Sequence, residues 1–341
     1  MAPLDLQLGQ ISQLAFGYWH AQVLFSATGL GVFDALADGP LPGDAVAERC
    51  GLPAEPCRRL LDAATALRLL VRDQATGEYG NTPAAQRLLT SASPESLTPW
   101  VKVMGRWYGP WGDLGEALRL GRAVEHRGSR LGDDPAYAED FILGMHAYNS
   151  RTAQALADAL PEPGPGPLRI ADVGGGAGTY SIALCKAWGE ARAEVVDLAA
   201  VLPIAEATVA GAGLADRITV REGDYYRDSF GADLDVVLLS NVLHQESREN
   251  GLDILRRARA ALRPGGRVLV HGHFLEESRT APAFTTLHNL SALVLWSGGR
   301  SYTAAEMAEL MADAGFADVD VRRTPEPSAR LLVGHRAADT R

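Results

Sequence analysis

Short runs of β-favouring residues alternate with helical segments through the second half of the chain. Five such runs read LRIADV, AEVVDL, RITVREGD, LDVVLLSN and GRVLVHGHF. Strands separated by helices of about 10–15 residues are typical of a parallel sheet with helices on both faces. A last helix and two strand-like runs, DVDVRRT and ARLLVGHR, predict an antiparallel hairpin at one edge of that sheet. The pattern therefore predicts an α/β domain over 161–341.

The first half of the chain carries helical signals instead. A helix is predicted by GYWHAQVLFSATGLGVFDALADG, whose apolar residues recur at three and four and which ends at glycine. Two short helices and a hairpin follow, in the outline of a winged helix. A DNA-reading module needs a basic recognition helix, whereas the second helix mixes Arg58 and Arg59 with Asp62 and alanines. We therefore favour a helical dimerisation or lid module over a DNA-binding regulator.

Composition restricts the compartment and the partners. The formal net charge of −10 argues against nucleic acid, because phosphate binding needs a basic surface. The three cysteines have no metal-ligand spacing and predict free thiols in a reducing compartment. The start MAPLDLQLGQ lacks the pattern of a secretory leader, and no apolar run reaches the roughly 18 residues of a membrane span. These features predict a cytoplasmic protein without a membrane or nucleic-acid partner.

A glycine-rich turn directly follows the first predicted strand. In an open α/β sheet, ligands bind beyond the carboxyl ends of the strands, and glycines let a ligand approach the backbone. A dinucleotide fingerprint, G-x-G-x-x-G, fails here because its third glycine would fall on Thr179. The residues fit D-x-G-x-G-x-G instead, through Asp172, Gly174, Gly176 and Gly178. An acid beside the turn disfavours a pyrophosphate and suits a ligand with a cationic end, such as S-adenosylmethionine.

Two further acids lie near the ends of the next two strands. Asp197 lies 19 residues past Gly178, where an acid commonly binds ribose hydroxyls. Asp224 follows the third strand, where its carboxylate can accept from an adenine amine, and Tyr225 can offer a flat face to the base. Each residue also has a structural alternative: Asp197 as a helix cap, Asp224 as a turn residue and Tyr225 as core.

In sequence order, the glycine turn, VVDL, EGDYY and NVLHQES resemble the small-molecule O-methyltransferases that use S-adenosyl-L-methionine, of the bacterial natural-product and plant phenolic types. The resemblance implies a Rossmann-like class I methyltransferase domain and a mainly helical N-terminal dimerisation domain with winged-helix character. We predict the dimerisation domain over 1–100, a helical connector contributing to the substrate pocket over 101–160, and the cofactor-binding domain over 161–341. The last boundary rests on the run PEPGPGP at 161–167, since proline and glycine end helices. The resemblance also implies a homodimer.

The resemblance assigns roles to individual residues. Gly174, Gly176 and Gly178 would line the methionine part of the cofactor. Asp197 would bind the ribose, Asp224 with Tyr225 would hold the adenine, and His244 would be the catalytic histidine. The sequence departs from the plant members at three acidic positions, which are Gln245, Gly272 and Ser301 here. Glu246, Glu276 or Glu277 are candidate replacements for the missing carboxylate partner of His244.

His244 suits proton removal from a phenol. A phenol of pKa about 10 is protonated at neutral pH, and a histidine of pKa about 6.5 is mostly neutral there and can accept the proton. The sequence therefore predicts an O-methyltransferase acting on a hydroxylated aromatic natural product. Rival hypotheses keep the fold and cofactor but perform hydroxylation, decarboxylation or N-methylation. A nicotinamide oxidoreductase is a further rival, opposed by Thr179.

Several other residues are candidates for the acceptor pocket. His271 and His273 share one face of the fifth strand, but a third ligand is not evident and no metal site is predicted. Aromatic residues at helical spacing can equally form core, so both interpretations stay open for the connector. The candidate substrate-binding residues are Met104, Trp107, Tyr108, Trp111, Met145, Asn149, His273, His288 and Asn289.

Overall fold

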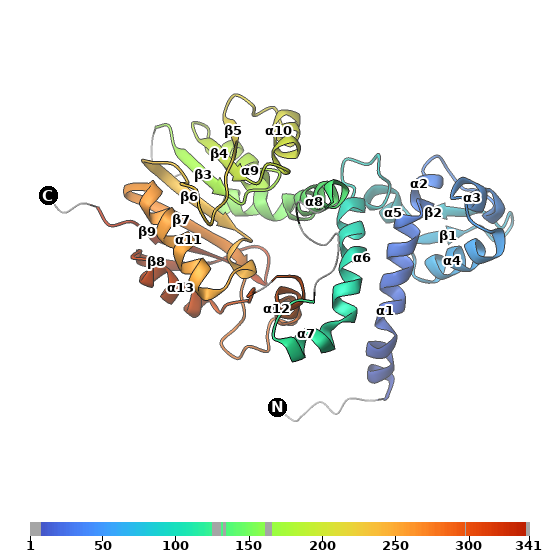
Figure 1. The fold of residues 1–341 in the computed structure, drawn as a ribbon. Coiled ribbons are helices and arrows are strands. Elements are labelled where there is room, and N and C mark those ends of the chain that lie inside the picture. The colour runs from blue at the N-terminus through green and yellow to red at the C-terminus, as the bar shows by residue number, and fades with distance from the viewer. Residues whose placement is uncertain (1–7, 125–130, 132–133, 161–165, 297, 339–341) are drawn as a thin grey trace. The chain divides into compact units, whose positions relative to one another are not determined.

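The structure, a computed structural model, describes residues 8–124, 131, 134–160, 166–296 and 298–338 (Figure 1). The chain divides into two compact units, Met1–Arg106 and Trp107–Arg341. Most of the run PEPGPGP lies outside the described residues. So does most of the N-terminal stretch MAPLDLQLGQ, which lacks the pattern of a secretory leader. The three-segment division made from the sequence therefore stays a prediction. The described residues contain no helix with the length and hydropathy of a transmembrane span.

The N-terminal unit is mainly helical and carries one small hairpin. Its core gathers Phe33, Leu36, Leu61 and Leu70. The two short helices and the hairpin expected from the sequence are present, and the hairpin strands pair antiparallel. The elements are α1 (Leu8–Gly29), α2 (Val32–Ala35), α3 (Gly43–Arg49), α4 (Ala54–Ala66), β1 (Leu70–Arg72), β2 (Tyr79–Asn81), α5 (Pro83–Leu88) and the start of α6 (Thr98–Gly112).

The C-terminal unit is built on a seven-stranded sheet in the order β5-β4-β3-β6-β7-β9-β8. The first five strands in that order are parallel, and β9 runs antiparallel between β7 and β8. The predicted parallel sheet and edge hairpin are therefore confirmed. The strands are β3 (Arg169–Val173), β4 (Arg192–Asp197), β5 (Ile218–Glu222), β6 (Leu234–Ser240), β7 (Leu262–His273), β8 (Ala317–Arg323) and β9 (Ala329–His335).

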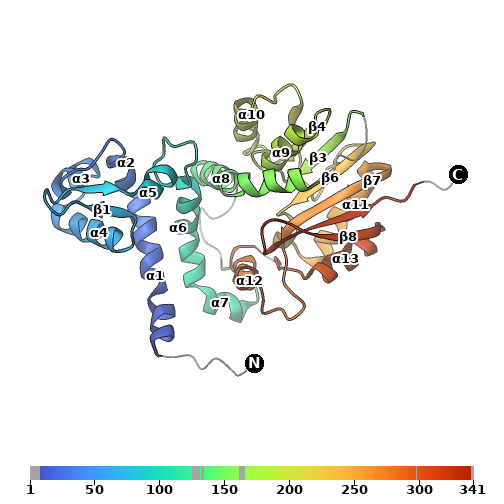
Figure 2. The same cartoon turned by 180° about the vertical axis from the view of Figure 1, so that it is seen from behind.

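Helices cover both faces of this sheet, because the central strands are apolar on both sides. Successive residues of a strand point to opposite faces, so Val236 and Leu238 pack with α8 and α9 whereas Val237 and Leu239 pack with α11 and α13. The two views show these helix pairs on opposite faces (Figures 1 and 2). The helices are α7 (Leu114–Leu120), α8 (Pro135–Ala159), α9 (Thr179–Ala187), α10 (Leu202–Gly211), η1 (Leu243–Gln245), α11 (Arg248–Ala261), α12 (Ala283–Leu295) and α13 (Ala304–Asp313).

The strand order predicts a ligand site at the carboxyl end of β3. This strand pairs with β4 on one side and with β6 on the other, so the connections leave it in opposite directions. Ligands bind at such a switch point, in the crevice beyond the strand ends. The residues after β3, β4 and β6 are therefore brought to one edge of the sheet.

Candidate active site

The turn after β3 requires glycine. Gly174, Gly176 and Gly178 have φ of 66°, 56° and 75°, in the left-handed region that other residues rarely adopt. A Cβ on Gly174 would also lie 2.9 Å from Cγ2 of Val242, which follows β6. The backbone of the turn therefore packs directly against the segment that leads from β6 to His244.

Asp172 lies beneath this turn and is 1% exposed. Its Oδ2 accepts a hydrogen bond of 2.7 Å from the Ser181 hydroxyl, whereas its buried Oδ1 has no partner among the described residues. Burial raises the pKa of the Asp172 carboxyl to about 6, although the hydrogen bond from Ser181 opposes that rise. A buried acceptor without a partner is costly, so this oxygen suits a ligand donor or cation.

Asp197, the last residue of β4, anchors the same turn. Its Oδ2 accepts from the Gly176 amide at 2.8 Å, and its Oδ1 accepts from the Leu198 amide at 2.7 Å. Burial raises the pKa of the Asp197 carboxyl, and the two amides act in the opposite direction. Since each carboxylate oxygen offers two lone pairs, one acceptor position remains on each.

Asp224 lies two residues beyond β5 and holds its own turn. It accepts from the Tyr226 amide at 2.9 Å and forms an ion pair of 2.7 Å with Arg227. Burial raises the pKa of Asp224, but the amide and the guanidinium outweigh this, so the net pKa is lowered. These contacts match the turn-residue alternative, and both carboxylate oxygens already accept hydrogen bonds.

Tyr225 reaches the glycine turn. A Cβ on Gly174 would lie 3.8 Å from Cε1 of its ring. Its hydroxyl donates to Glu246 at 2.8 Å, and the Tyr226 hydroxyl donates to the same carboxylate at 2.8 Å. Burial and the Glu246 charge raise the pKa of Tyr225 far above its usual range and that of Tyr226 to about 12. Both tyrosines therefore stay protonated as donors.

Glu246, one of the three candidate partners of His244, instead accepts hydrogen bonds from the two tyrosines. It is 2% exposed, and besides the two tyrosines it accepts from Asn250 at 3.1 Å. Glu276 and Glu277 are exposed. Within the described part of the chain, no hydrogen bond joins any of these three carboxylates to His244. The candidate base therefore lacks a direct carboxylate partner among them.

The side chain of His244, on η1 after β6, packs in a cluster of rings. Its centroid lies 4.8 Å from that of His288 and 5.3 Å from that of Trp296. His273 of β7 lies 5.9 Å from His288, and Trp107 of α6 lies 6.0 Å from Trp296. Four residues predicted for the site from distant parts of the sequence are therefore neighbours, and Trp296 is one that the sequence analysis missed.

The clustered histidines are neutral at pH 7. Burial, together with the charges that His288 and His273 would carry, lowers the pKa of His244 well below 6.5. Burial and His273 lower the pKa of His288 to about 4, and burial lowers the pKa of His273 although Glu326 opposes this. Desolvation disfavours the imidazolium, so each ring is present as imidazole, the form that accepts a proton.

Among the remaining predicted pocket residues, two asparagines make hydrogen bonds to backbone groups, and two aromatic residues are exposed or half-buried. The Asn289 Oδ1 accepts from the Ser301 amide at 2.7 Å, and Asn149 donates to the Met145 carbonyl at 2.9 Å. Tyr108 is exposed and Trp111 is half-buried, while Met104 lies on the part of α6 that belongs to the N-terminal unit. The structure therefore neither supports nor contradicts a role for these residues in binding the acceptor.

His271 is separate from the ring cluster around His244. It is buried, its Nδ1 lies 3.0 Å from the Ser240 hydroxyl, and its ring lies 5.2 Å from that of Tyr180. Searched over the described residues, the His, Cys, Asp and Glu side chains form no group able to hold a metal ion. His271 is thus a buried histidine whose Nδ1 contacts Ser240 and whose Nε2 has no hydrogen-bond partner among the described residues.

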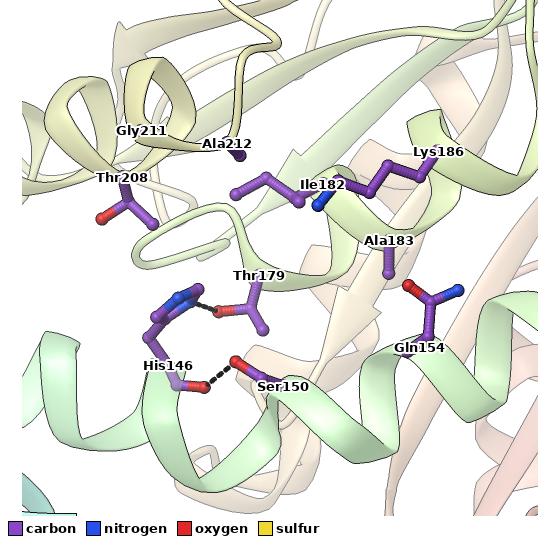
Figure 3. A pocket seen from close by; sticks show the side chains of 10 residues that line it. All are labelled: His146, Ser150, Gln154, Thr179, Ile182, Ala183, Lys186, Thr208, Gly211 and Ala212. Carbon is purple, nitrogen blue, oxygen red and sulfur yellow. Dashed lines mark hydrogen bonds between the residues drawn. The ribbon is translucent and has the colours of Figure 1, made fainter. Parts of the chain in front are cut away.

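A hollow of about 350 Å³ lies among α8, α9 and α10, away from the ring cluster. His146 and Lys186 are its titratable residues, and the His146 Nδ1 lies 2.9 Å from the Thr179 hydroxyl (Figure 3). Burial and then the nearby Lys186 charge lower the pKa of His146. None of the predicted site residues lines this hollow.

Comparison with known families decides the class of the protein. The O-methyltransferase domain matches residues 131–317, and the O-methyltransferase dimerisation domain matches residues 12–91. The chain belongs to the O-methyltransferase family. The domain match spans the glycine turn, Asp197, Tyr225 and the rings around His244.

Relatives match this O-methyltransferase over nearly its whole length. It is 33% identical to 3-hydroxy-5-methyl-1-naphthoate 3-O-methyltransferase of Streptomyces sahachiroi, over 95% of this chain and 93% of the relative. It is 31% identical to the tetracenomycin polyketide synthesis 8-O-methyl transferase TcmO of Streptomyces glaucescens, over 96% of each chain. The crystal structure of human N-acetylserotonin methyltransferase in complex with SAM superposes with a TM-score of 0.85 at 28% identity, over 99% of this chain and 100% of that one.

The cofactor of this O-methyltransferase is S-adenosylmethionine, and the glycine turn fits it. The cofactor presents a cationic ammonium and sulfonium. The turn offers Asp172, whose buried Oδ1 has no partner among the described residues, and glycines that let a ligand approach the backbone. The predicted fold, enzyme class and cofactor are thereby confirmed.

Proposed function

We propose that this O-methyltransferase methylates a hydroxyl group on an aromatic natural product and that His244 is the general base. The observation that carries the proposal is the position of the neutral His244 ring. It packs against Trp296 and His288, and it lies two residues after Val242, which contacts the glycine turn. Two bacterial relatives named for a naphthoate and for tetracenomycin support the acceptor class.

The cofactor is proposed to lie along the carboxyl ends of β3, β4 and β5. Asp172 and the turn glycines Gly174, Gly176 and Gly178 would hold its methionine part, with the free Asp172 Oδ1 as acceptor. Asp197 would bind the ribose through its two remaining acceptor positions, and the Tyr225 ring would face the adenine. Asp224 would accept from the adenine amine only at a lone pair that its turn and Arg227 leave free. When bound, the cofactor supplies the electrophilic methyl group and its leaving group.

His244 then has one task, removal of the proton from the acceptor hydroxyl at a ring nitrogen. Its lowered pKa keeps that nitrogen unprotonated at neutral pH. The same low pKa makes the imidazole a weak base, so the proton is best transferred as the methyl–oxygen bond forms. General base catalysis of this kind contributes about 10²–10⁴-fold.

Flat apolar rings suit an aromatic acceptor. Trp296 and Trp107 lie edge to face, and Phe141 of α8 lies 6.2 Å from Trp107. Such surfaces bind an aromatic ring and exclude water from the reacting hydroxyl. We propose Met104, Tyr108, Trp111, Met145, Asn149, His273, His288 and Asn289 as the remaining contacts of the acceptor.

The test is the mass of the product formed with S-adenosylmethionine that carries a trideuterated methyl group. Hydroxynaphthoates, other phenols and an aromatic amine serve as acceptors. The proposal expects a phenol product heavier by the labelled methyl group, released together with S-adenosylhomocysteine. A product that gains oxygen, loses carbon dioxide or carries the label on nitrogen would contradict it.

We further propose that the enzyme acts as a cytoplasmic homodimer, with a dimerisation domain over 1–100, a connector over 101–160 and a catalytic domain over 161–341. The dimerisation-domain match over residues 12–91 supports the dimer. Exposed apolar side chains along α1, among them Leu14 and Trp19, offer a surface that a second copy would cover.

A further inference from the structure

The proposed base has no hydrogen bond to Glu246, Glu276 or Glu277, and the described residues offer a carboxylate by a different route. His273 Nδ1 lies 2.9 Å from the Ser328 hydroxyl oxygen, and that hydroxyl donates to the Glu326 carboxylate at 3.0 Å. Ser328 is buried, and Glu326 lies in the turn between β8 and β9. A carboxylate is thus connected to the ring cluster by two hydrogen bonds.

The direction of these hydrogen bonds fixes the tautomer of His273. An ionised carboxylate only accepts, so the single hydroxyl hydrogen of Ser328 is directed to Glu326. The Ser328 oxygen must then accept from His273, which places the proton of that ring on Nδ1. Its Nε2 is left as an unprotonated acceptor. The buried His288 Nδ1 likewise has no hydrogen-bond partner among the described residues.

Ring contacts, through His288, lead from His273 to the proposed base His244. His288 lies 5.9 Å from His273 and 4.8 Å from His244, between centroids. Phe284 and Trp296, which are apolar, border the cluster at 4.8 Å from His273 and 5.3 Å from His244. A proton taken up by His244 therefore charges a buried group with two neutral histidines beside it.

The charged groups near the cluster are few in the described part of the chain. Glu326 raises the pKa of His273 against the effect of burial. Tyr148 of α8 also faces Glu326, and its own pKa is raised by burial and then by that carboxylate. The backbone amide of Arg300 donates to the His244 carbonyl, but its guanidinium pairs with Glu306. Glu326 is thus the carboxylate that acts on His273, the ring of the cluster that Ser328 joins to it.

We propose that Glu326, through Ser328 and His273, supplies the orienting negative charge that His244 lacks from a direct neighbour. In this arrangement His273 is a positioning residue, held with its Nδ1 protonated by the hydrogen bond to Ser328. Glu326 stabilises the positive charge that His244 gains when it takes the acceptor proton. The inference rests on the proposed role of His244 as base.

The first test needs neither cofactor nor acceptor. Histidine-labelled enzyme is examined by ¹⁵N–¹³C NMR over a pH series, as wild type and as Glu326→Gln. The wild type is expected to show His273 protonated on Nδ1, and Glu326→Gln to lower the His273 pKa further and mix the two tautomers. Asp320→Asn, which removes an exposed carboxylate from the same hairpin, is the matched control and should leave the His273 signals unchanged.

The second test is the pH dependence of turnover. Removing the negative charge should lower the pKa of the base, so Glu326→Gln is expected to move the acid limb of the kcat profile to lower pH. It should reduce kcat at the plateau by roughly 3- to 10-fold while KM for the cofactor stays within about twofold. Ser328→Ala leaves the Glu326 charge in place but breaks its hydrogen-bonded link to His273, so it should mix the His273 tautomers and reduce kcat, with a smaller shift of the acid limb. Glu326→Ala replaces Glu326→Gln if that variant does not fold. An acid limb that stays in place in a folded Glu326 variant overturns the proposal.

The two proposals fail in different ways. If His244→Ala retains turnover, the role of His244 as base is wrong, and the orienting role of Glu326 falls with it. The NMR series still decides whether Glu326 sets the tautomer of His273. If His244→Ala is inactive but the tautomer is unchanged in Glu326→Gln, only the connection through Ser328 is wrong.

Discussion

At the scale of single residues, burial shifts the pKa values of several ionisable groups around the candidate site toward the neutral form. His244, His288 and His273 are pressed together in a buried cluster, and His271 is buried separately with a pKa lowered to about 3. Asp172 is shifted in the opposite sense, to a pKa of about 6. Desolvation is the main cause in every case, and it disfavours the charged form of both residue types.

The lowered histidine pKa values predict a loss of stability in mild acid. Below pH 6.5 the unfolded chain protonates these histidines while the folded chain does not, so the free energy of unfolding falls as pH falls from about 6.5 toward about 4. Each such group contributes on the order of 1 kcal/mol per pH unit in that window. Asp172 opposes the trend, because its folded pKa lies above the unfolded value. Urea unfolding at pH 7.5, 6.5 and 5.5 measures the slope.

His288→Phe provides the control for that series. It removes one titrating group and fills the space with a ring of similar shape, so the fall in stability between pH 6.5 and 5.5 should become shallower than in the wild type. Equal slopes in the two proteins would mean that His288 is not held neutral in the fold.

Asp197→Ala should weaken binding of S-adenosylhomocysteine by about 2–3 kcal/mol, because it removes a charged acceptor from ribose hydroxyls. It also frees the Gly176 amide, which Asp197 holds at 2.8 Å in the turn. Isothermal calorimetry measures the change. Asp216→Ala, on an exposed position before β5, is the control and should leave the affinity unchanged. A wild-type affinity in Asp197→Ala would place the ribose elsewhere.

At the scale of elements, the turn between β3 and α9 leaves little room for side chains at its glycines. Gly174→Ala combines a φ of 66° with a Cβ 2.9 Å from Val242. We expect a loss of about 1–3 kcal/mol in stability and a larger loss in cofactor affinity, since the turn must move where the cofactor binds. Thermal unfolding with and without S-adenosylhomocysteine measures both. Gly189→Ala, whose Cβ would meet nothing within 4 Å, should behave as the wild type.

The elements also separate what sequence alone could predict from what it could not. The alternation of strand-like runs with helical segments predicted the parallel strands. The strand runs could be recognised because strands buried on both faces are apolar along their length, as in LDVVLLSN. The two strand-like runs at the end of the chain predicted the edge hairpin. The spacing D-x-G-x-G-x-G identified Asp172 at the end of β3 and the glycines of the turn that follows. The connection from His273 to Ser328 spans 55 residues and depends on β9 pairing beside β7. Likewise Trp107 and Trp296 meet only through folding, so no local signal marks them as neighbours.

At the scale of the whole molecule, the dimerisation domain and the exposed apolar face of α1 predict a homodimer. Light scattering after gel filtration should give about twice the chain mass of 36.3 kDa. Trp19→Asp, which places a charge on a side chain that is 53% exposed, should shift the enzyme toward monomer. Val321→Asp, on an exposed position of β8, should remain dimeric. A monomeric wild type would contradict the proposed assembly.

The proposed mechanism requires His244 to act as the base for an aromatic hydroxyl bound beside the cofactor turn. The decisive measurement is turnover of His244→Ala on a phenol that the wild type methylates, together with its affinity for S-adenosylhomocysteine. We predict a loss of roughly 10²-fold or more in kcat with an affinity within about twofold of the wild type, because the ring moves a proton and does not hold the cofactor. Turnover close to that of the wild type, at equal cofactor affinity, would contradict it.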